Sequence, residues 1–196
     1  MAGPNALTIW AFIAKTTQLT IWPLCWITCA LSAPLSAAIP LVASCPWSLT
    51  SGILVRVMAL YLQGCGPGYR SDKARATWNE RTEARAQSLD DGGLDALGGA
   101  SEVRKSIQNT ATGLAHAARG IMSQVDARVI NSLPEISVPT LVLVGENDTP
   151  YLTGSDYMAS HISGSINVRV DDAAHGVNID QPEEINKALA DFLAGL

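Results

Sequence analysis

Two uninterrupted apolar runs stand out in the second part of the chain. Residues 57–63 (VMALYLQ) are β-branched and apolar, and they end at a glycine-rich stretch, residues 64–68. Residues 137–145 (SVPTLVLVG) are equally apolar and do not alternate with polar side chains. Such runs are typical of strands that are buried on both faces of a parallel sheet. Each run therefore predicts a central strand that leads into a loop.

Helical segments separate and follow these strands. Residues 71 to about 132 are rich in Ala, Arg, Glu and Gln and are broken by paired glycines, which predicts several helices joined by turns. Residues 151–162 suit a helix and residues 165–170 a further strand, followed by a loop over 171–178. Asp180 is the expected N-cap of a closing helix with Pro182 in its first turn. That helix should turn one apolar face inward: Ile185, Leu189, Phe192 and Leu193.

The order strand, helices, strand, helix, strand, helix builds a mostly parallel sheet covered by helices. The sequence therefore predicts an α/β fold over residues 57–196.

Residues 1–56 have a different character. The first 69 residues contain two charged side chains, Lys15 and Arg56, and all 18 acidic side chains come later. Four of the five tryptophans and all four cysteines also lie in this first part.

Composition narrows the possible functions. The net charge of −5 and the pI near 5.1 give no basic footprint for nucleic acid. Cys25 and Cys29 are four residues apart, but no second Cys or His pair with zinc-ligand spacing follows, so neither a metal nor a cofactor is expected. The expected partner is a small-molecule substrate. The uncharged run would suggest a membrane anchor over residues 7–45, but Pro23, Pro34 and Pro40 interrupt it, so a cytoplasmic protein is favoured and membrane association is the alternative.

Polar residues that follow two predicted strands carry the candidate chemistry. Asp148 lies just past the strand at 137–145, and His175 lies just past the strand at 165–170. Ligand sites in parallel sheets lie beyond the carboxyl ends of the strands. An Asp beside a His fixes the imidazole tautomer and stabilises the imidazolium that forms during acyl transfer. Two other readings stay open: Asp148 as a plain helix cap, and His175 as a structural histidine.

Two segments resemble motifs of the α/β-hydrolase superfamily. Residues 138–148 (VPTLVLVGEND) look like its acid motif, and residues 173–183 (AAHGVNIDQPE) look like its histidine motif. Residues 118–134 are similar to the segment that leads from the helical cap to the acid. The resemblance covers about residues 57–196 and implies that residues 71–132 form the cap, which shapes the substrate pocket. It also implies hydrolysis of an ester, lactone or related carbonyl substrate, with Asp148 and His175 as catalytic residues.

The nucleophile is missing from its expected place. The family has a His-Gly oxyanion loop and a G-x-S-x-G elbow upstream of the strand at 57–63, and this sequence contains no G-x-S-x-G. The nearest match to this motif would put Thr50 at the nucleophile position. Ser44, Ser51 and Cys65 are other conceivable nucleophiles, but Cys65 is more readily interpreted as part of the pocket wall. Because no nucleophile is identified, we expect the chain itself to be nearly inactive.

The same absence suggests two further hypotheses. A reading-frame error or wrong gene start over residues 1–56 would explain the missing elbow, the missing acids and the excess of Cys and Trp. Alternatively, the chain is a non-catalytic remnant of the fold that serves as a binding or interaction module. Tyr69, Arg70 and Trp78 are candidates for lining the pocket, although packing explains them equally well, and His116 and His161 are given no role.

Overall fold

A computed structural model describes residues 26–31, 57–99 and 110–196. It contains a four-stranded sheet with the strands in the order β1-β2-β3-β4. These are β1 (Trp26–Leu31), β2 (Val57–Gln63), β3 (Thr140–Gly145) and β4 (Ile166–Val170). β2, β3 and β4 are parallel neighbours, whereas β1 pairs antiparallel with β2. The last residues of the three parallel strands, Gln63, Gly145 and Val170, therefore lie at the same edge of the sheet.

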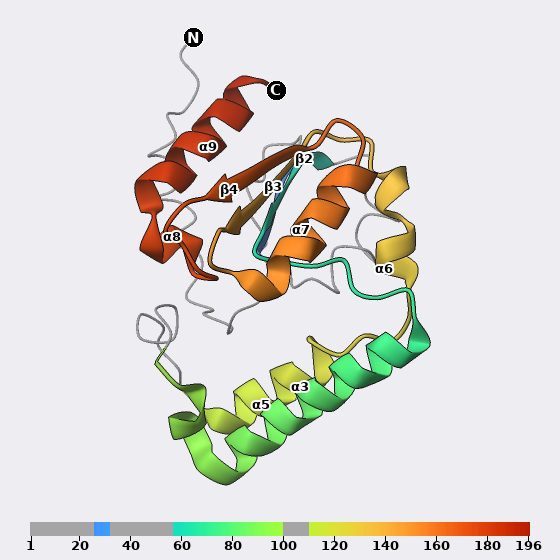
Figure 1. Cartoon of the computed structure of the whole chain (residues 1–196), viewed down its shortest axis with the longest axis vertical. Coiled ribbons are helices and arrows are strands. Elements are labelled where there is room, and N and C mark those ends of the chain that lie inside the picture. The colour runs from blue at the N-terminus through green and yellow to red at the C-terminus, as the bar shows by residue number, and fades with distance from the viewer. Residues whose placement is uncertain (1–25, 32–56, 100–109) are drawn as a thin grey trace.

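Helices cover both faces of the parallel strands, as Figure 1 shows. On one face, helix α7 (Thr149–His161), the short helix α6 (Arg128–Asn131) and the 3-10 turn η3 (Leu133–Glu135) pack on side chains such as Leu60, Leu62 and Val142. On the other face, α8 (Val177–Asp180) and α9 (Pro182–Ala194) pack on Tyr61, Leu141 and Leu143. Successive residues of a strand point to opposite faces, so a strand covered on both sides must be apolar throughout.

The two central strands were predicted with nearly correct limits. β2 has the expected bounds, and all six residues of β3 are buried. β3 begins at Thr140 and not at residue 137, because Pro139 has no N–H to donate; its carbonyl still accepts a hydrogen bond from Leu60 N at 2.9 Å. Helix α7 begins at Thr149, two residues earlier than predicted, with Pro150 in its first turn.

The closing helix differs from its prediction at two positions. Asp180 is not its N-cap: Gln181 occupies that position, and Asp180 ends the separate helix α8, where its carboxylate accepts a hydrogen bond from Ala174 N. The predicted inner face holds for Ile185 and Phe192, which are buried, and Leu189 packs beside them. Leu193, in the last turn of α9, is 39% exposed, so the buried face does not extend to it.

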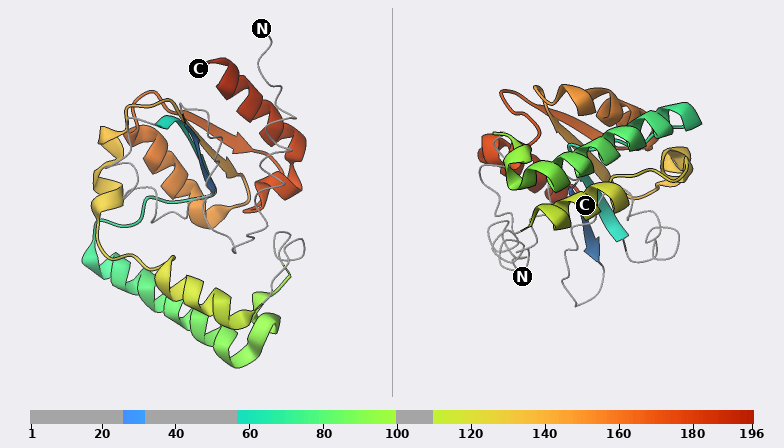
Figure 2. Two further views of the ribbon diagram at one scale, coloured as in Figure 1. Left: turned by 180° about the vertical axis from the view of Figure 1, so that it is seen from behind. Right: turned by 90° about the horizontal axis from the view of Figure 1, so that it is seen from below.

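The predicted helices between β2 and β3 are present. Two helices, α3 (Asp72–Gly92) and α5 (Ala111–Gly120), form an antiparallel pair that lies apart from the sheet (Figure 2). The 3-10 turn η2 (Gly93–Leu97) follows α3 directly. Ser71 and Thr110 cap α3 and α5 through their hydroxyl oxygens. The pair has a small core of its own, composed of Ala86, Leu89, Leu114, Ala115 and Ala118.

The segments that enter and leave this helix pair are joined to each other. The Asn79 side chain donates to Gln124 O at 2.9 Å and accepts from Gln124 N at 2.8 Å. Trp78 Nε1 donates to Met122 O at 2.7 Å, and Gln124 Oε1 accepts from Tyr69 N at 3.1 Å. These four contacts, which we call the neck, hold residues 69–79 beside residues 122–124.

β1 was not predicted from the sequence. It is the described part of the apolar segment 7–45, and the rest of that segment lies outside the described residues. Within the described ranges, no helix is long and apolar enough to cross a bilayer. Thr50, Ser44 and Ser51, the conceivable nucleophiles before β2, also lie outside the described residues.

Candidate active site

The chain leaves β3 through a tight turn that ends at Asp148. The N–H of Asp148 donates to Gly145 O at 3.0 Å, and its carbonyl accepts from Tyr151 N at 2.9 Å, so the backbone of Asp148 begins helix α7. The side chain forms no capping hydrogen bond within the described structure. The reading of Asp148 as a plain helix cap is therefore wrong for its carboxylate, which points elsewhere.

The loop that carries His175, residues 171–176, is fixed against the Asp148 turn by backbone contacts. Glu146 N donates to Val170 O and Asn147 N donates to Ala173 O, each at 2.9 Å. From the other side, Asp180 accepts from Ala174 N at 3.0 Å. Gly145 permits this approach, because a Cβ on it would lie 2.3 Å from Ala174 O and 2.4 Å from Ala173 O. The two loops are thus packed backbone against backbone.

This packing brings Asp148 and His175 together. Asp148 Oδ2 lies 2.8 Å from His175 Nδ1, a normal hydrogen-bond distance. The Asp148 side chain is 4% exposed, whereas the imidazole is 18% exposed. An ionised carboxylate only accepts hydrogen bonds, so the hydrogen of a neutral imidazole lies on Nδ1. Nε2 then carries the free lone pair, which is the arrangement that a general base requires.

Two more residues border the imidazole. Gly64, the residue after β2, has φ +54°, and a Cβ on it would lie 3.3 Å from His175 Cε1 and Nδ1. The Tyr151 ring lies 4.9 Å from the His175 ring, centroid to centroid, at an interplanar angle of 35°. Neither residue was predicted from the sequence, although the glycine-rich end of β2 was a usable signal for a close backbone approach.

The other candidate residues lie elsewhere. Cys65 is not a wall of an open pocket: it is 3% exposed and packs in the core beneath α7 with Leu62 and Met158. Trp78 and the backbone of Tyr69 belong to the neck, and the Arg70 guanidinium lies 5.7 Å from the centre of the Tyr157 ring. His161 stacks on Tyr157 at 3.9 Å. His116 is exposed on α5.

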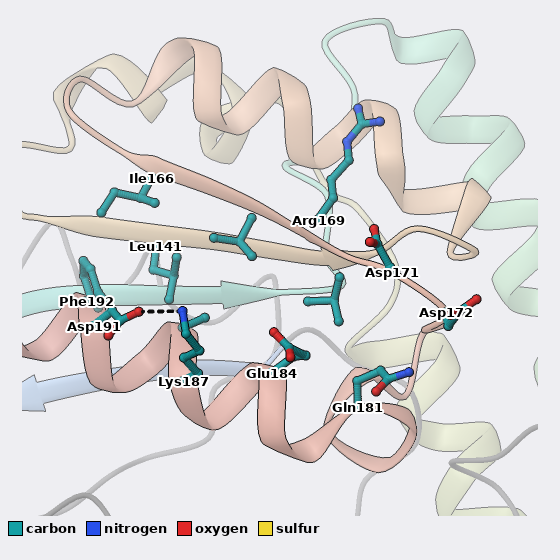
Figure 3. Close-up of a pocket in the computed structure, with 13 residues that line it drawn as sticks. Leu141, Ile166, Arg169, Asp171, Asp172, Gln181, Glu184, Lys187, Asp191 and Phe192 are labelled. Carbon is teal, nitrogen blue, oxygen red and sulfur yellow. Dashed lines mark hydrogen bonds and ion pairs between the residues drawn. The ribbon is translucent and has the colours of Figure 1, made fainter.

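A groove of about 610 Å³ lies between β4 and α9 (Figure 3). Its apolar end contains Leu141, Ile166 and Phe192, and its polar end contains Asp171 and Asp172. Among the described residues, its lining includes neither Asp148 nor His175. No group of three or more potential metal ligands occurs in the described part of the chain.

No family model matches the chain. The chain is 29% identical over 147 aligned residues to 3-oxoadipate enol-lactonase 1 of Acinetobacter baylyi. This match covers 64% of this chain and 54% of that protein. The structure resembles MenH from S. aureus with a TM-score of 0.63 and 21% identity, over 71% of this chain and 59% of MenH. It resembles a thermophilic esterase from Thermogutta terrifontis with a TM-score of 0.64 and 22% identity, over 78% of this chain and 61% of the esterase.

These likenesses confirm the predicted fold. The chain has part of an α/β-hydrolase fold, with a mostly parallel sheet between two layers of helices. It spans about half the length of the curated relative and about three fifths of the two solved structures.

Proposed function

We propose that Asp148 and His175 are the acid and the base of a nucleophile–His–acid triad in a hydrolase that acts on an ester, a lactone or a related carbonyl substrate. The observation that carries this proposal is the 2.8 Å contact between Asp148 Oδ2 and His175 Nδ1 at the carboxyl edge of the sheet. The named relatives, an enol-lactonase and an esterase, support the substrate class.

Each residue has a defined task in this proposal. His175 Nε2 takes the proton from the attacking hydroxyl or water and later returns it to the leaving group. Asp148 holds the ring in the tautomer that leaves Nε2 free and stabilises the imidazolium that forms between these two steps. Burial of the carboxylate strengthens this stabilisation, because solvent screens a buried charge less than an exposed one.

The helix pair α3–α5 fits the place of a substrate cap in this proposal, since it is inserted between β2 and β3 and leaves the sheet near the carboxyl edge. The nucleophile and the oxyanion donors remain unassigned. A His–Asp pair without them retains only a fraction of the rate that a complete triad reaches. We therefore expect slow hydrolysis that depends on both residues.

The test compares hydrolysis of p-nitrophenyl acetate and of dihydrocoumarin, a simple lactone, by the whole chain and two variants. His175→Ala and Asp148→Asn should each lower kcat by about tenfold or more, because a positioned base contributes at least that much. His116→Ala, an exposed histidine on α5, is the matched control and should keep the wild-type rate.

Two results would contradict this function. Equal rates in the wild type and both variants would remove the catalytic assignment. Absence of turnover, together with no labelling of the wild type by a fluorophosphonate probe, would leave the chain as a non-catalytic binding module.

A further inference from the structure

A buried polar chain links β2 to the helix that follows His175. Tyr61 Oη donates to Gln63 Oε1 at 2.6 Å, and Gln63 Nε2 donates to Asn178 Oδ1 at 3.2 Å. Tyr61 and Gln63 are 7% and 5% exposed, whereas Asn178 is exposed on α8. The chain thus begins inside the core and ends at the surface, three residues after His175.

A buried glutamine at the end of a central strand needs an explanation. Burying an amide costs free energy unless its donors and acceptors are paired, and an apolar residue would avoid this desolvation cost. Gln63 shares the face of Tyr61, which packs with Val177 of α8. Its amide is therefore placed to hold α8, not to complete the apolar layer.

Two successive residues at the end of β2 meet α8 and the His175 loop. Gln63 binds Asn178 through its side chain, and Gly64 lies beside the imidazole through its backbone. Asp180 anchors the same loop to α8 through Ala174 N. A displacement of α8 would therefore move the loop and change the distance from His175 to Asp148.

We propose that Gln63 is a positioning residue for His175, acting through Asn178. Tyr61 orients the Gln63 amide so that its NH₂ group faces α8. This inference rests on the proposed function, since positioning matters only if the imidazole works as a base. It assigns a role to the asparagine in the histidine segment AAHGVN and to an uncharged polar residue within an apolar strand.

The test uses Asn178→Ala, because Asn178 is exposed and its replacement should not prevent folding. Two readouts follow His175 without requiring turnover. One is the hydrogen-bonded Nδ1–H signal in the NMR spectrum, assigned by its loss in His175→Ala. The other is the rate at which diethyl pyrocarbonate modifies each histidine, resolved by peptide mass mapping.

Asn178→Ala should broaden or remove the Nδ1–H signal and speed modification of His175 about 2- to 10-fold, the change in local opening expected when one hydrogen bond is lost. His116 and His161 should react at unchanged rates. Asn178→Asp keeps an acceptor for Gln63 Nε2 and should restore wild-type behaviour. Gln63→Leu should reproduce the effect of Asn178→Ala, and combining the two should add nothing further.

Leu62→Ala provides the matched control, because Leu62 is equally buried but faces the opposite side of the sheet. It should lower the Tm without changing the His175 signal. Wild-type behaviour of Asn178→Ala, or equal acceleration of all three histidines, would overturn the proposal. A missing Nδ1–H signal in the wild type would instead count against the Asp148–His175 pair itself, so the two failures are distinguishable.

Discussion

Gly64 lies directly against the imidazole of His175. A Cβ added to Gly64 would be 3.3 Å from two ring atoms of His175 and 3.5 Å from Asp148 Oδ2. Gly64 cannot easily move away, because its N–H donates to Leu143 O at 2.9 Å. Its φ of +54° also disfavours any other residue at this position. The backbone at the end of β2 therefore forms one wall of the space that holds the Asp–His pair.

The first prediction concerns this wall. Gly64→Ala should destabilise the fold by about 1–2 kcal/mol from the left-handed conformation alone, and it should also displace the imidazole. Urea unfolding and the NMR signal of His175 Nδ1–H measure the two effects. Gly66→Ala is the control, since a Cβ there meets no described atom within 4 Å. A Gly64→Ala protein with unchanged stability and an unchanged signal would contradict the close contact.

Gly145 leads to a stronger prediction. A Cβ at this position would lie 2.3 Å from a backbone carbonyl oxygen that cannot rotate away, so Gly145→Ala should cost about 4 kcal/mol or more. We expect little soluble protein, or a Tm lowered by well over ten degrees. Gly120→Ala, where no described atom lies within 4 Å of the added Cβ, should express and unfold like the wild type. Similar yields of both variants would show that the two loops are not packed together.

The third prediction concerns pH. Arg169 hydrogen-bonds to Asp156 and holds the pKa of that carboxyl below its usual value. A lowered folded-state pKa contributes stability above the unfolded pKa, near 3.9, and this contribution is lost as the pH falls through the folded-state pKa. Asp156→Asn should therefore lower the Tm by about 2 °C at pH 7, a small shift because the pair is half exposed, and the difference should shrink as the pH falls below the unfolded pKa. A difference that stays the same size down to low pH would rule out this origin.

The fourth prediction concerns residues 1–56. If this segment is read out of frame, one of the other two reading frames of the DNA should encode a G-x-S-x-G elbow a few tens of codons before Val57. A corrected chain should then hydrolyse p-nitrophenyl acetate far faster than the present one, because it regains a nucleophile. If neither frame contains such an elbow, residues 1–56 are a native, diverged segment.

Much of the fold follows from local pattern. β2 and β3 are recognisable because both of their faces are buried, which removes the polar alternation of a half-exposed strand. The closeness of Asp148 and His175 follows from topology, since parallel neighbouring strands deliver their loops to one edge. These inferences need only the order of elements along the chain.

Other features depend on tertiary context. Asp180 has the residue type of an N-cap, but its carboxylate accepts a hydrogen bond from Ala174 N in the loop before α8 and so does not cap the helix after it. The role of Gln63 depends on Asn178, which is 115 residues away, and no local pattern announces such a pair. β1 was missed because its pairing with β2 is antiparallel and its sequence is set among prolines and other apolar residues.

The neck makes the helix pair an exchangeable module. Because Asn79 and Gln124 already bring the entering and leaving segments together, the chain between them closes a loop whose ends are fixed. The entropic cost of closing such a loop rises slowly with its length, by about 0.6 kcal/mol for each doubling. Evolution or a protein engineer can therefore replace residues 80–121 by longer, shorter or unrelated helical hairpins while the sheet beneath keeps its geometry.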